Sequence, residues 1–443
     1  MDLAATRQAV QFDGVPFLAR LALRLASQIR YGTVHVRLPD QRTVTLRGRL
    51  PGPSATIELN NYRFARSLVM GGDIGMAEAY IRGDWTTPDL TQLLYVFCLN
   101  EELVDSAFAG NMLVRFCRRM LHRLRRNTRQ GSRHNIHSHY DLGNEFFAAW
   151  LDSSMTYSSA LFPAETADLP AAQHHKYEQL AKAIELRPGQ SVLEIGCGWG
   201  GFAEFAAKTY GASVVALTIS KEQHEFARRR IHEAGLAEKV QVRLQDYRDQ
   251  EGHFDRIASI EMIEAVGEQF WPAYFNQLNR RLKPGGLAGI QAITVRDELF
   301  DSYRQRVDFI QRYIFPGGML PSTNILRSLG ERFEVPVIRE RVFGTRLCKD
   351  DRTLARELRQ GMGRPDLARV RRALPPAVGI LSVLLRGRVQ GRKDRRGAVD
   401  ICPSKLMRFR RPSARVRYLS ARSRESAQRF SERIILKQTS KAR

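Results

Sequence analysis

The sequence predicts an α/β protein whose central region forms a doubly wound, mostly parallel sheet. Strand-like and helical segments alternate from about residue 172 to 295 with short connections between them. A glycine-rich turn, "EIGCGWGG" at 194–201, follows the first strand-like segment and opens a helix. A small α+β domain is expected before this region, and an irregular basic tail after it.

Five hydrophobic segments are expected to be the parallel strands. They read "SVLEIGC", "ASVVALT", "VQVRLQD", "FDRIASI" and "LAGIQAIT". The segments "KEQHEFARRRIHEAG" and "FWPAYFNQLNRRL" between them are expected to be helices. Ligands of such sheets bind at the carboxyl ends of the strands, so the loops that follow these segments are the candidate site.

The N-terminal α+β domain is assigned to residues 1–110. Three β-rich runs lie between residues 34 and 59, and a mostly helical stretch follows, with a break at Gly83 to Trp85. A linker rich in Arg and His follows at 111–138. We interpret it either as a solvated helix or as a patch that contacts anionic phospholipid headgroups. No window has the ~18 uninterrupted apolar residues of a membrane span.

The net charge of +24 would suggest nucleic-acid binding, but it is concentrated at one end. Residues 346–443 contain 28 basic and 8 acidic residues, whereas the rest of the chain contains 42 and 38. We therefore expect no nucleic-acid partner. The five cysteines show no metal-ligand spacing and an odd count, which favours a reducing cytoplasm and no metal site.

The glycine-rich turn is a candidate cofactor loop. Glycines let the backbone approach a ligand closely, and the helix that follows offers N–H donors. A carboxylate two residues before the first glycine suits a ligand with an amine and a sulfonium, and would repel a pyrophosphate. S-adenosylmethionine fits this description. The candidate contacts are Glu194, Gly196, Gly198, Gly200, Thr218, Ser220, Gln223, Asp246 and Tyr247.

Several further segments are typical of one family. They include "HYDLGNEFFAAWLDSSMTYSSALF", "VLEIGCGWGGFAEFAA", "FDRIASIEMIEAVGEQFWPAYF" and "FIQRYIFPGGMLPS", in order over roughly residues 135–345. The sequence thereby resembles the cyclopropane-fatty-acyl-phospholipid synthase family of S-adenosylmethionine-dependent lipid methyltransferases. The resemblance implies a Rossmann-like class I methyltransferase domain, assigned to 139–345. It also implies methyl transfer to the double bond of unsaturated fatty acyl chains of phospholipids, with bicarbonate as an anion base.

Individual residues carry over from this resemblance. It implies that Tyr157, Ser158 and Trp199 contact the cofactor, and that Glu264 and Ile293 belong to the bicarbonate site. Two positions depart from the family, which has Cys at Ser159 and His at Gln291. Ser and Gln can still hydrogen-bond an anion, but without an imidazole the proton route changes. The sequence leaves open a cyclopropane or a methyl-branched (methylene) product.

The resemblance also implies a location and partners. We expect a cytoplasmic protein, peripheral at the inner face of the membrane, that acts on phospholipid acyl chains at an anionic surface. A homodimer is compatible with the sequence. The alternative hypothesis is a catalytically impaired relative, or a binding module, that keeps the cofactor fold.

The Arg-rich tail at 346–443 departs from the family and is nearly free of aromatic residues. Our hypothesis is a slip of reading frame near Arg346. The codons of "RLCKD" and "LARVRRALPP" can hide family-like strings in one neighbouring frame. The competing hypothesis is a basic tail that binds a membrane or nucleic acid. Resequencing of this region distinguishes the two, because an intact frame would contradict the slip.

Overall fold

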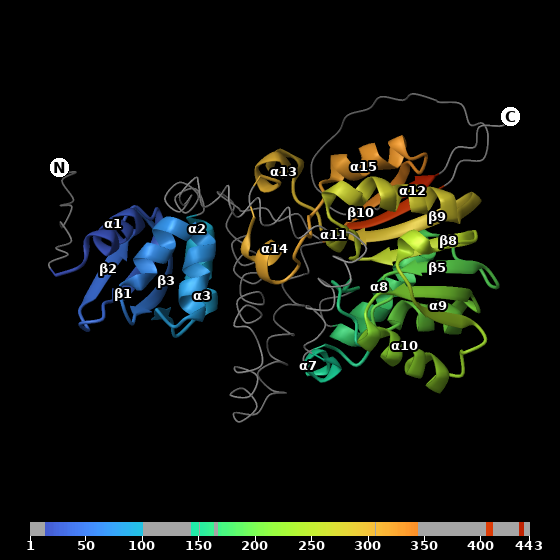
Figure 1. Cartoon of the computed structure of the whole chain (residues 1–443), viewed down its shortest axis with the longest axis horizontal. Coiled ribbons are helices and arrows are strands. Elements are labelled where there is room, and N and C mark those ends of the chain that lie inside the picture. The colour runs from blue at the N-terminus through green and yellow to red at the C-terminus, as the bar shows by residue number, and fades with distance from the viewer. Residues whose placement is uncertain are drawn as a thin grey trace. The chain divides into compact units, whose positions relative to one another are not determined.

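A computed structural model describes residues 14–100, 143–149, 151–163, 167–305, 307–343, 405–410 and 434–437 (Figure 1). The described residues fall into two compact units, an N-terminal one and a larger one. The predicted linker at 111–138 and the predicted domain boundaries near 110, 139 and 345 lie outside the described residues.

The N-terminal unit is a four-stranded sheet with the strand order β2-β1-β3-β4. Alternating burial along β1 and β2 places one face of the sheet on the core and the other in solvent. The elements of this unit are α1 (Phe17–Ala26), β1 (Tyr31–Arg37), β2 (Thr43–Arg47), β3 (Leu50–Leu59), α2 (Arg63–Ile81), β4 (Trp85–Thr86) and α3 (Leu90–Leu99). The three predicted β-rich runs fall on β1, β2 and β3, and the predicted helical stretch falls on α2 and α3, whereas α1 and β4 were not predicted.

The break predicted at Gly83 to Trp85 is a turn that leads into β4. Gly83 has a φ of 77°, a backbone conformation that glycine adopts readily. Asp84 is buried and pairs with Arg82 at 2.8 Å. The Trp85 indole packs in the core and donates to the carbonyl of Met76 at 3.0 Å, which ties β4 to α2.

The larger unit contains an eight-stranded sheet in the order β10-β11-β12-β9-β8-β5-β6-β7. The strands from β9 to β7 are parallel, and each of the five predicted strand segments falls on one of them. These five strands are β5 (Ser191–Ile195), β6 (Ser213–Thr218), β7 (Val240–Leu244), β8 (Phe254–Ile260) and β9 (Leu282–Ala292). This pattern confirms the predicted doubly wound α/β class.

Helices cover both faces of this sheet (Figure 1). Buried side chains of α12 and α15 join one core cluster, and those of α8 and α9 join the other. At Gly289 of β9 an added Cβ would lie 2.5 Å from Leu180 of α8, so the glycine permits close packing of this helix. The helical elements are α7 (Asn144–Ala148), α8 (Leu169–Ala183), α9 (Gly201–Tyr210), α10 (Lys221–Glu233), η1 (Tyr247–Asp249), α11 (Ile263–Val266), η2 (Glu268–Phe270), α12 (Trp271–Arg281), α13 (Asp297–Tyr303), α14 (Phe309–Tyr313) and α15 (Thr323–Arg332).

Three strands extend the sheet beyond β9. They are β10 (Val337–Val342), β11 (Lys405–Arg410) and β12 (Ile434–Lys437). β11 is antiparallel to both β9 and β10. β11 and β12 belong to the region for which the sequence predicts an irregular tail, so this part of the region is regular. The rest of 346–443 lies outside the described residues.

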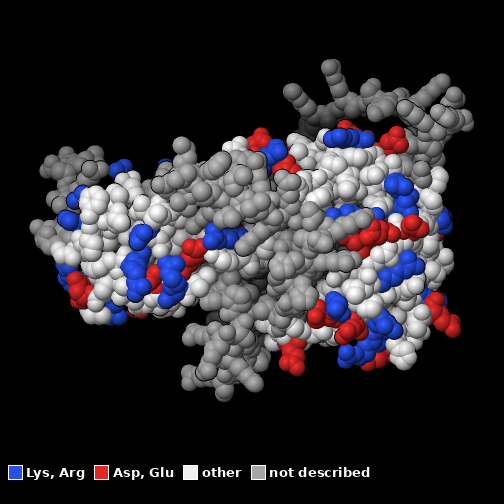
Figure 2. Space-filling view, viewed as in Figure 1, with Lys and Arg blue, Asp and Glu red and all other residues white. Residues whose placement is uncertain are grey.

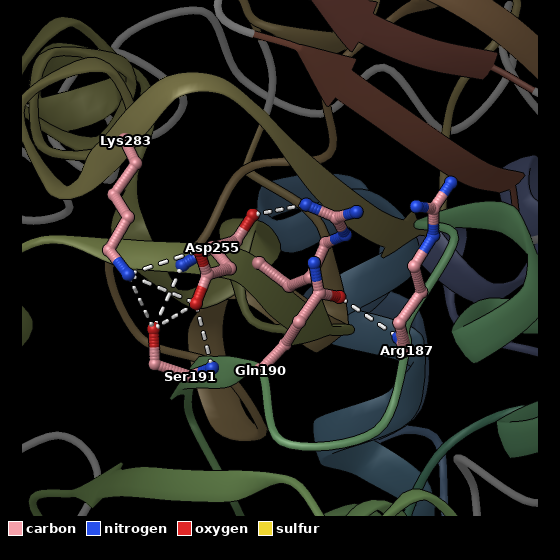
Figure 3. Close-up of polar contacts among 6 residues, drawn as sticks. Arg187, Gln190, Ser191, Asp255 and Lys283 are labelled. Carbon is pink, nitrogen blue, oxygen red and sulfur yellow. Dashed lines mark hydrogen bonds and ion pairs between the residues drawn. The ribbon is translucent and has the colours of Figure 1, made fainter.

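A polar cluster joins three strands at their amino-terminal ends (Figure 3). The Asp255 carboxylate of β8 accepts from the backbone and hydroxyl of Ser191 on β5, at 2.9 and 2.7 Å. Lys283 of β9 donates to the same carboxylate at 3.0 Å. Burial raises the pKa of Asp255, but the bonds from Ser191 and Lys283 outweigh it and hold the pKa below its usual value. This cluster fixes the register of the central strands at the edge opposite the predicted site.

Charges of both signs are interspersed on the described surface shown in Figure 2. This agrees with the near balance of charge expected for the chain before the tail. In the described ranges, no helix is long and apolar enough to cross a membrane. Nor do these ranges hold a group of His, Cys, Asp or Glu side chains suited to a metal ion.

Candidate active site

The sequence-predicted residues gather at one edge of the larger sheet. Each lies in, or just after, the carboxyl end of one of the strands β5 to β9, except for three in the segment 151–163 that precedes α8. Those three are Tyr157, Ser158 and Ser159. Parallel strands end at a common edge, which brings residues distant in sequence into one region.

The glycine loop between β5 and α9 has three left-handed residues. Gly196, Gly198 and Gly200 have φ angles of 81°, 52° and 84°. An added Cβ at Gly196 would lie 2.7 Å from the Met262 side chain, so this glycine is needed for packing. At Gly198 an added Cβ meets no described atom within 4 Å, so this glycine faces space that a ligand can fill.

Glu194 stands at the end of β5 and is buried, with 2% of its surface exposed. Burial raises the pKa of its carboxyl well above the usual value, and a hydrogen bond from the Ala203 backbone and the charge of Arg230 oppose this rise. Its Oε2 has no hydrogen-bond partner among the described residues. A buried carboxylate oxygen without a partner suits a cationic ligand, which is the observation by which S-adenosylmethionine fits this loop.

The residues after β6 bond to one another. Ser220 is the N-cap of α10 and accepts from the Gln223 backbone at 3.3 Å. The Thr218 hydroxyl donates to the Gln223 side chain at 2.8 Å and accepts from the Ser220 backbone at 3.2 Å. All three are buried. These bonds stabilise the turn itself. A contact between these side chains and a ligand therefore stays a prediction.

Asp246 follows β7 and forms a two-pronged ion pair with Arg248. Its two carboxylate oxygens accept from the Arg248 guanidinium at 2.9 and 2.6 Å, and Asp246 is 3% exposed. An ionised carboxylate offers about four acceptor positions, so this pair orients Asp246 without exhausting it. The Tyr247 ring packs edge-on against Tyr274, with centroids 5.7 Å apart.

Side chains of Arg230 and Trp199 hold the segment 151–163 and helix α7, respectively, against the glycine loop. The Arg230 guanidinium of α10 donates to the carbonyl of Ser154 at 2.7 Å and to the carbonyl of Trp199 at 3.4 Å. The Trp199 indole donates to Asn144 at 2.7 Å and packs against Phe147, with centroids 5.0 Å apart.

Two side chains of helix α8 hold Ser158 in place. Lys176 is 1% exposed and donates to the Ser158 hydroxyl at 2.6 Å. Gln173 donates to the Ser158 carbonyl at 2.9 Å and accepts from Lys176. Both side chains thus bind the segment that the resemblance assigns to the cofactor.

Ser159 and Gln291 meet at a carboxylate that the sequence analysis did not select. Glu261, just after β8, accepts from the Ser159 backbone N–H at 3.0 Å. Its same oxygen accepts from the Gln291 amide at 2.8 Å. The amide of Gln291, which is fully buried, also donates to the Ser159 carbonyl at 3.0 Å.

Glu264 lies one turn further along, in α11. One oxygen of its carboxyl accepts from the backbone N–H of Ile293, and Oε2 has no partner among the described residues. Burial, followed by the charge of Glu261, raises the pKa of Glu264 to about 8. Glu264 is therefore mostly protonated at neutral pH. Glu264 and Ile293 are thus brought together, as the resemblance implied.

Sequence reasoning missed Glu261, Arg230, Arg248, Gln173 and Lys176. The available signal for Glu261 was its place directly after a predicted parallel strand, inside a segment already quoted for the resemblance. Gln173 and Lys176 lie on a helix outside any glycine-rich or acidic motif, so only the packing of α8 reveals them.

Comparison with known proteins places this site in a family. The family model described as mycolic acid cyclopropane synthetase matches residues 127–359, which is just over half of the chain. The chain belongs to this family. It is 41% identical over 282 residues to the tuberculostearic acid methyltransferase UfaA1 of Mycobacterium tuberculosis. It is 34% identical over 294 residues to the cyclopropane-fatty-acyl-phospholipid synthase of Escherichia coli strain K12.

The matched lengths differ between relatives of the mycolic acid cyclopropane synthetase family. The match covers 59% of this chain and 62% of the mycobacterial protein, and 65% of this chain and 72% of the E. coli protein. A probable fatty acid methyltransferase of Pseudomonas putida is 39% identical over 43% of this chain and 49% of its own length. The chain therefore spans less than two thirds of the mycobacterial and Pseudomonas relatives.

Solved structures support the fold. The mycolic acid cyclopropane synthase CmaA1, complexed with SAH and CTAB, is 25% identical, with a TM-score of 0.53 over 62% of this chain and 96% of its own. The cyclopropane synthase MmaA2 from Mycobacterium tuberculosis, 23% identical, has a TM-score of 0.55 over 62% of this chain and 97% of its own. Family membership confirms the predicted family, the class I methyltransferase fold and S-adenosylmethionine as the cofactor. The roles of the individual site residues stay predictions.

We expect Gly198→Ala to weaken cofactor binding more than it weakens folding. A left-handed alanine costs roughly 1–2 kcal/mol of stability, and the new methyl group would enter the ligand space. Gly189→Ala is a matched control, because Gly189 also has a positive φ and open surroundings but lies in the turn before β5. Calorimetric titration with S-adenosylmethionine should show at least about tenfold weaker binding only in the first variant. Equal effects in both would contradict the assignment.

Glu264→Gln should change how stability depends on pH. Below its usual pKa of 4.5 the Glu264 carboxyl is protonated in both the folded and the unfolded chain. Between 4.5 and about 8 the unfolded chain releases the proton while the folded chain keeps it, so the free energy of unfolding falls as pH rises. The fall is at most about 1.4 kcal/mol per pH unit for one group.

The measurement is denaturant unfolding at about pH 5 and about pH 8. The wild type should lose more stability than Glu264→Gln over this interval. Glu298→Gln, on the exposed side of α13, serves as the control and should behave as the wild type. The same pH dependence in all three proteins would show that Glu264 titrates normally.

Proposed function

We propose that this protein transfers a methyl group from S-adenosylmethionine to the double bond of an unsaturated fatty acyl chain of a phospholipid. The observation that supports this most directly is the site at the carboxyl edge of the sheet. There the glycine loop follows β5, and the buried Glu194 has one oxygen without a partner among the described residues. The Glu261 and Glu264 carboxyls follow the neighbouring strand β8. A methyl donor and a proton acceptor are the two groups that alkylation of an alkene needs.

The phospholipid as substrate is supported by the E. coli relative, whose name specifies it. The mycobacterial relative is named as a fatty acid methyltransferase, and the E. coli relative is named for a cyclopropane product. Both products share a first step, in which one alkene carbon takes the methyl group and its neighbour becomes a cation. They differ in where a proton then leaves. The proposal covers both products.

The chain's own residues have distinct tasks in this reaction. S-adenosylmethionine supplies an electrophilic methyl group on its sulfonium. Glu194 offers a buried acceptor to the cationic end of the cofactor, and Gly198 leaves room for close approach of the backbone. Lys176 and Gln173 hold Ser158 in place, so that the segment 151–163 keeps its position over the loop. Fixed positioning of this kind contributes much of the rate when the nucleophile is as weak as an alkene.

We further propose that the protein works in the cytoplasm at the inner, anionic surface of the membrane. Helix α1 supports this part of the proposal. Phe17 is 72% exposed, and Leu18 and Leu21 are each 39% exposed on the same short helix. Arg20 and Arg24, also exposed, lie beside them. Apolar side chains flanked by arginines suit the boundary between acyl chains and anionic headgroups.

Phe17→Glu together with Leu21→Glu should weaken binding to vesicles of phosphatidylcholine and phosphatidylglycerol by at least about tenfold, because two apolar side chains lose their burial. Co-sedimentation measures this binding. Leu50→Glu is the control, since Leu50 is 39% exposed in the same unit but lies on β3. Unchanged binding of the double variant would exclude α1 as the contact.

The activity itself is tested by expression of the chain in a bacterium that lacks related enzymes, followed by mass spectrometry of its fatty acids. Unsaturated chains heavier by one CH₂ unit are expected in the phospholipid fraction, and fragmentation distinguishes a ring from a branch. Glu264→Gln should reduce the product. If soluble protein binds S-adenosylmethionine but forms no product, the chain is the catalytically impaired relative of the alternative hypothesis.

A further inference from the structure

The N–H donors of the region that the resemblance assigns to bicarbonate are already bound to acceptors of this chain. The Ser159 backbone N–H and one amide hydrogen of Gln291 go to Glu261, at 3.0 and 2.8 Å. The second amide hydrogen of Gln291 goes to the Ser159 carbonyl at 3.0 Å. The Ile293 backbone N–H goes to Glu264. A bicarbonate ion would have to displace these bonds and approach the carboxyl groups of Glu261 and Glu264.

The backbone of Glu261 has a conformation that is unusual for a residue other than glycine. Its φ is 48°, in the left-handed region that costs a non-glycine residue on the order of 1 kcal/mol. Among the described residues, five residues other than glycine have a positive φ. Two of them, Met155 and Glu261, lie in the segments that form this site. Strain that persists at an active site is held by its surroundings. Here the Glu261 backbone N–H donates to the Gln291 carbonyl at 2.8 Å, and the Glu261 side chain accepts from Ser159 and Gln291.

We propose that the Glu261 carboxylate is the base of this active site and takes the place of an exogenous anion such as bicarbonate. The inference rests on the proposed function. Glu261 is not among the residues that the resemblance assigns to the bicarbonate site, so its carboxylate is an additional acidic group there. The Gln291 amide, standing where the family has an imidazole, binds and orients that carboxylate and does not itself carry a proton.

The alkylated acyl chain carries a cation beside the carbon that took the methyl group. A C–H bond then breaks, and its proton goes to a Glu261 oxygen. For a cyclopropane, the electron pair of that bond forms the third bond of the ring. For a methylene group, a hydride shift comes first, and the electron pair then forms the double bond. The carboxylic acid then returns the proton to water. No oxidant, reductant or further co-reactant is needed.

Glu264 complements this role. Burial and the neighbouring Glu261 raise the pKa of Glu264 to about 8, so Glu264 is mostly neutral at pH 7 and adds little charge beside Glu261. Hydrogen-bond donors orient a carboxylate oxygen and stabilise negative charge on it. Glu261 has two such donors on a single oxygen.

The decisive variant is Glu261→Gly. Glycine adopts a φ of 48° without strain, so the fold is expected to remain, while the carboxylate disappears and its donors become available. In buffer depleted of carbon dioxide, wild-type methyl transfer to phospholipid vesicles should be unaffected, and that of Glu261→Gly should fall roughly 10²- to 10⁴-fold. Added sodium bicarbonate should restore at least about a tenth of the methyl-transfer activity that Glu261→Gly has lost.

Two controls separate a base from a structural residue. Glu334→Gly removes another left-handed glutamate, exposed in the turn after α15, and should leave both rates unchanged. Glu261→Gln keeps the side-chain volume but supplies no base, so its activity should fall and bicarbonate should not rescue it.

A binding measurement needs no lipid substrate. Calorimetric titration with sodium bicarbonate should give heat of binding with Glu261→Gly and none with the wild type. Wild-type binding as tight as that of the variant, or wild-type activity that requires added bicarbonate, would overturn the proposal. If no protein transfers methyl groups, the proposed function fails, while the titration still decides whether Glu261 occupies the anion site.

Discussion

The side-chain amide of Gln291 holds together three parts of the chain that are distant in sequence. From the end of β9 it donates to the Ser159 carbonyl, 132 residues earlier, and to the Glu261 carboxylate after β8. Glu261 in turn accepts from the Ser159 backbone. Because Gln291 is fully buried, loss of any one partner would leave a polar group unsatisfied in the interior. The segment 151–163 is therefore placed by the sheet that lies beneath it.

The same principle operates around the cofactor loop. Arg230 of α10 binds carbonyls of both the segment 151–163 and the glycine loop, and Lys176 of α8 binds Ser158. Long cationic side chains from two different helices thus fix a segment with little secondary structure of its own. A site of this construction is preorganised, because the backbone that lines it is bonded before a ligand arrives. At the far edge of the sheet the Asp255 cluster performs the matching task for strand register.

Charge at the site is divided between two acidic environments. Glu194 on β5 is buried beside the glycine loop, and one of its oxygens has no partner in the described part of the chain, so a cationic ligand would satisfy it. Glu261 and Glu264 follow β8, where the Glu264 carboxyl is mostly neutral near pH 7 and that of Glu261 accepts two N–H bonds. In the proposed reaction, the first arrangement would serve the sulfonium donor and the second the removal of a proton.

Much of this could be predicted from the sequence by itself. Hydrophobic period and the glycine turn determined the five parallel strands, their order along the chain and the edge at which the site lies, because these features depend on local pattern and on a general rule for parallel sheets. Family motifs added Ser159, Gln291, Glu264 and Ile293 as members of one site. The acidic residue before the turn identified the class of cofactor.

Only the tertiary structure decided how those residues are used. Ser220 and Gln223 bond to each other within their turn, and Asp246 is paired with Arg248. The contacts of Glu261 join residues 102 and 30 positions away, so no local pattern could reveal them. Two strands in the Arg-rich region, β11 and β12, depend on pairing with β9 and were likewise invisible to periodicity. Long-range hydrogen bonds form between segments whose separation in the sequence is arbitrary, and for that reason they belong to the fold and not to the sequence pattern.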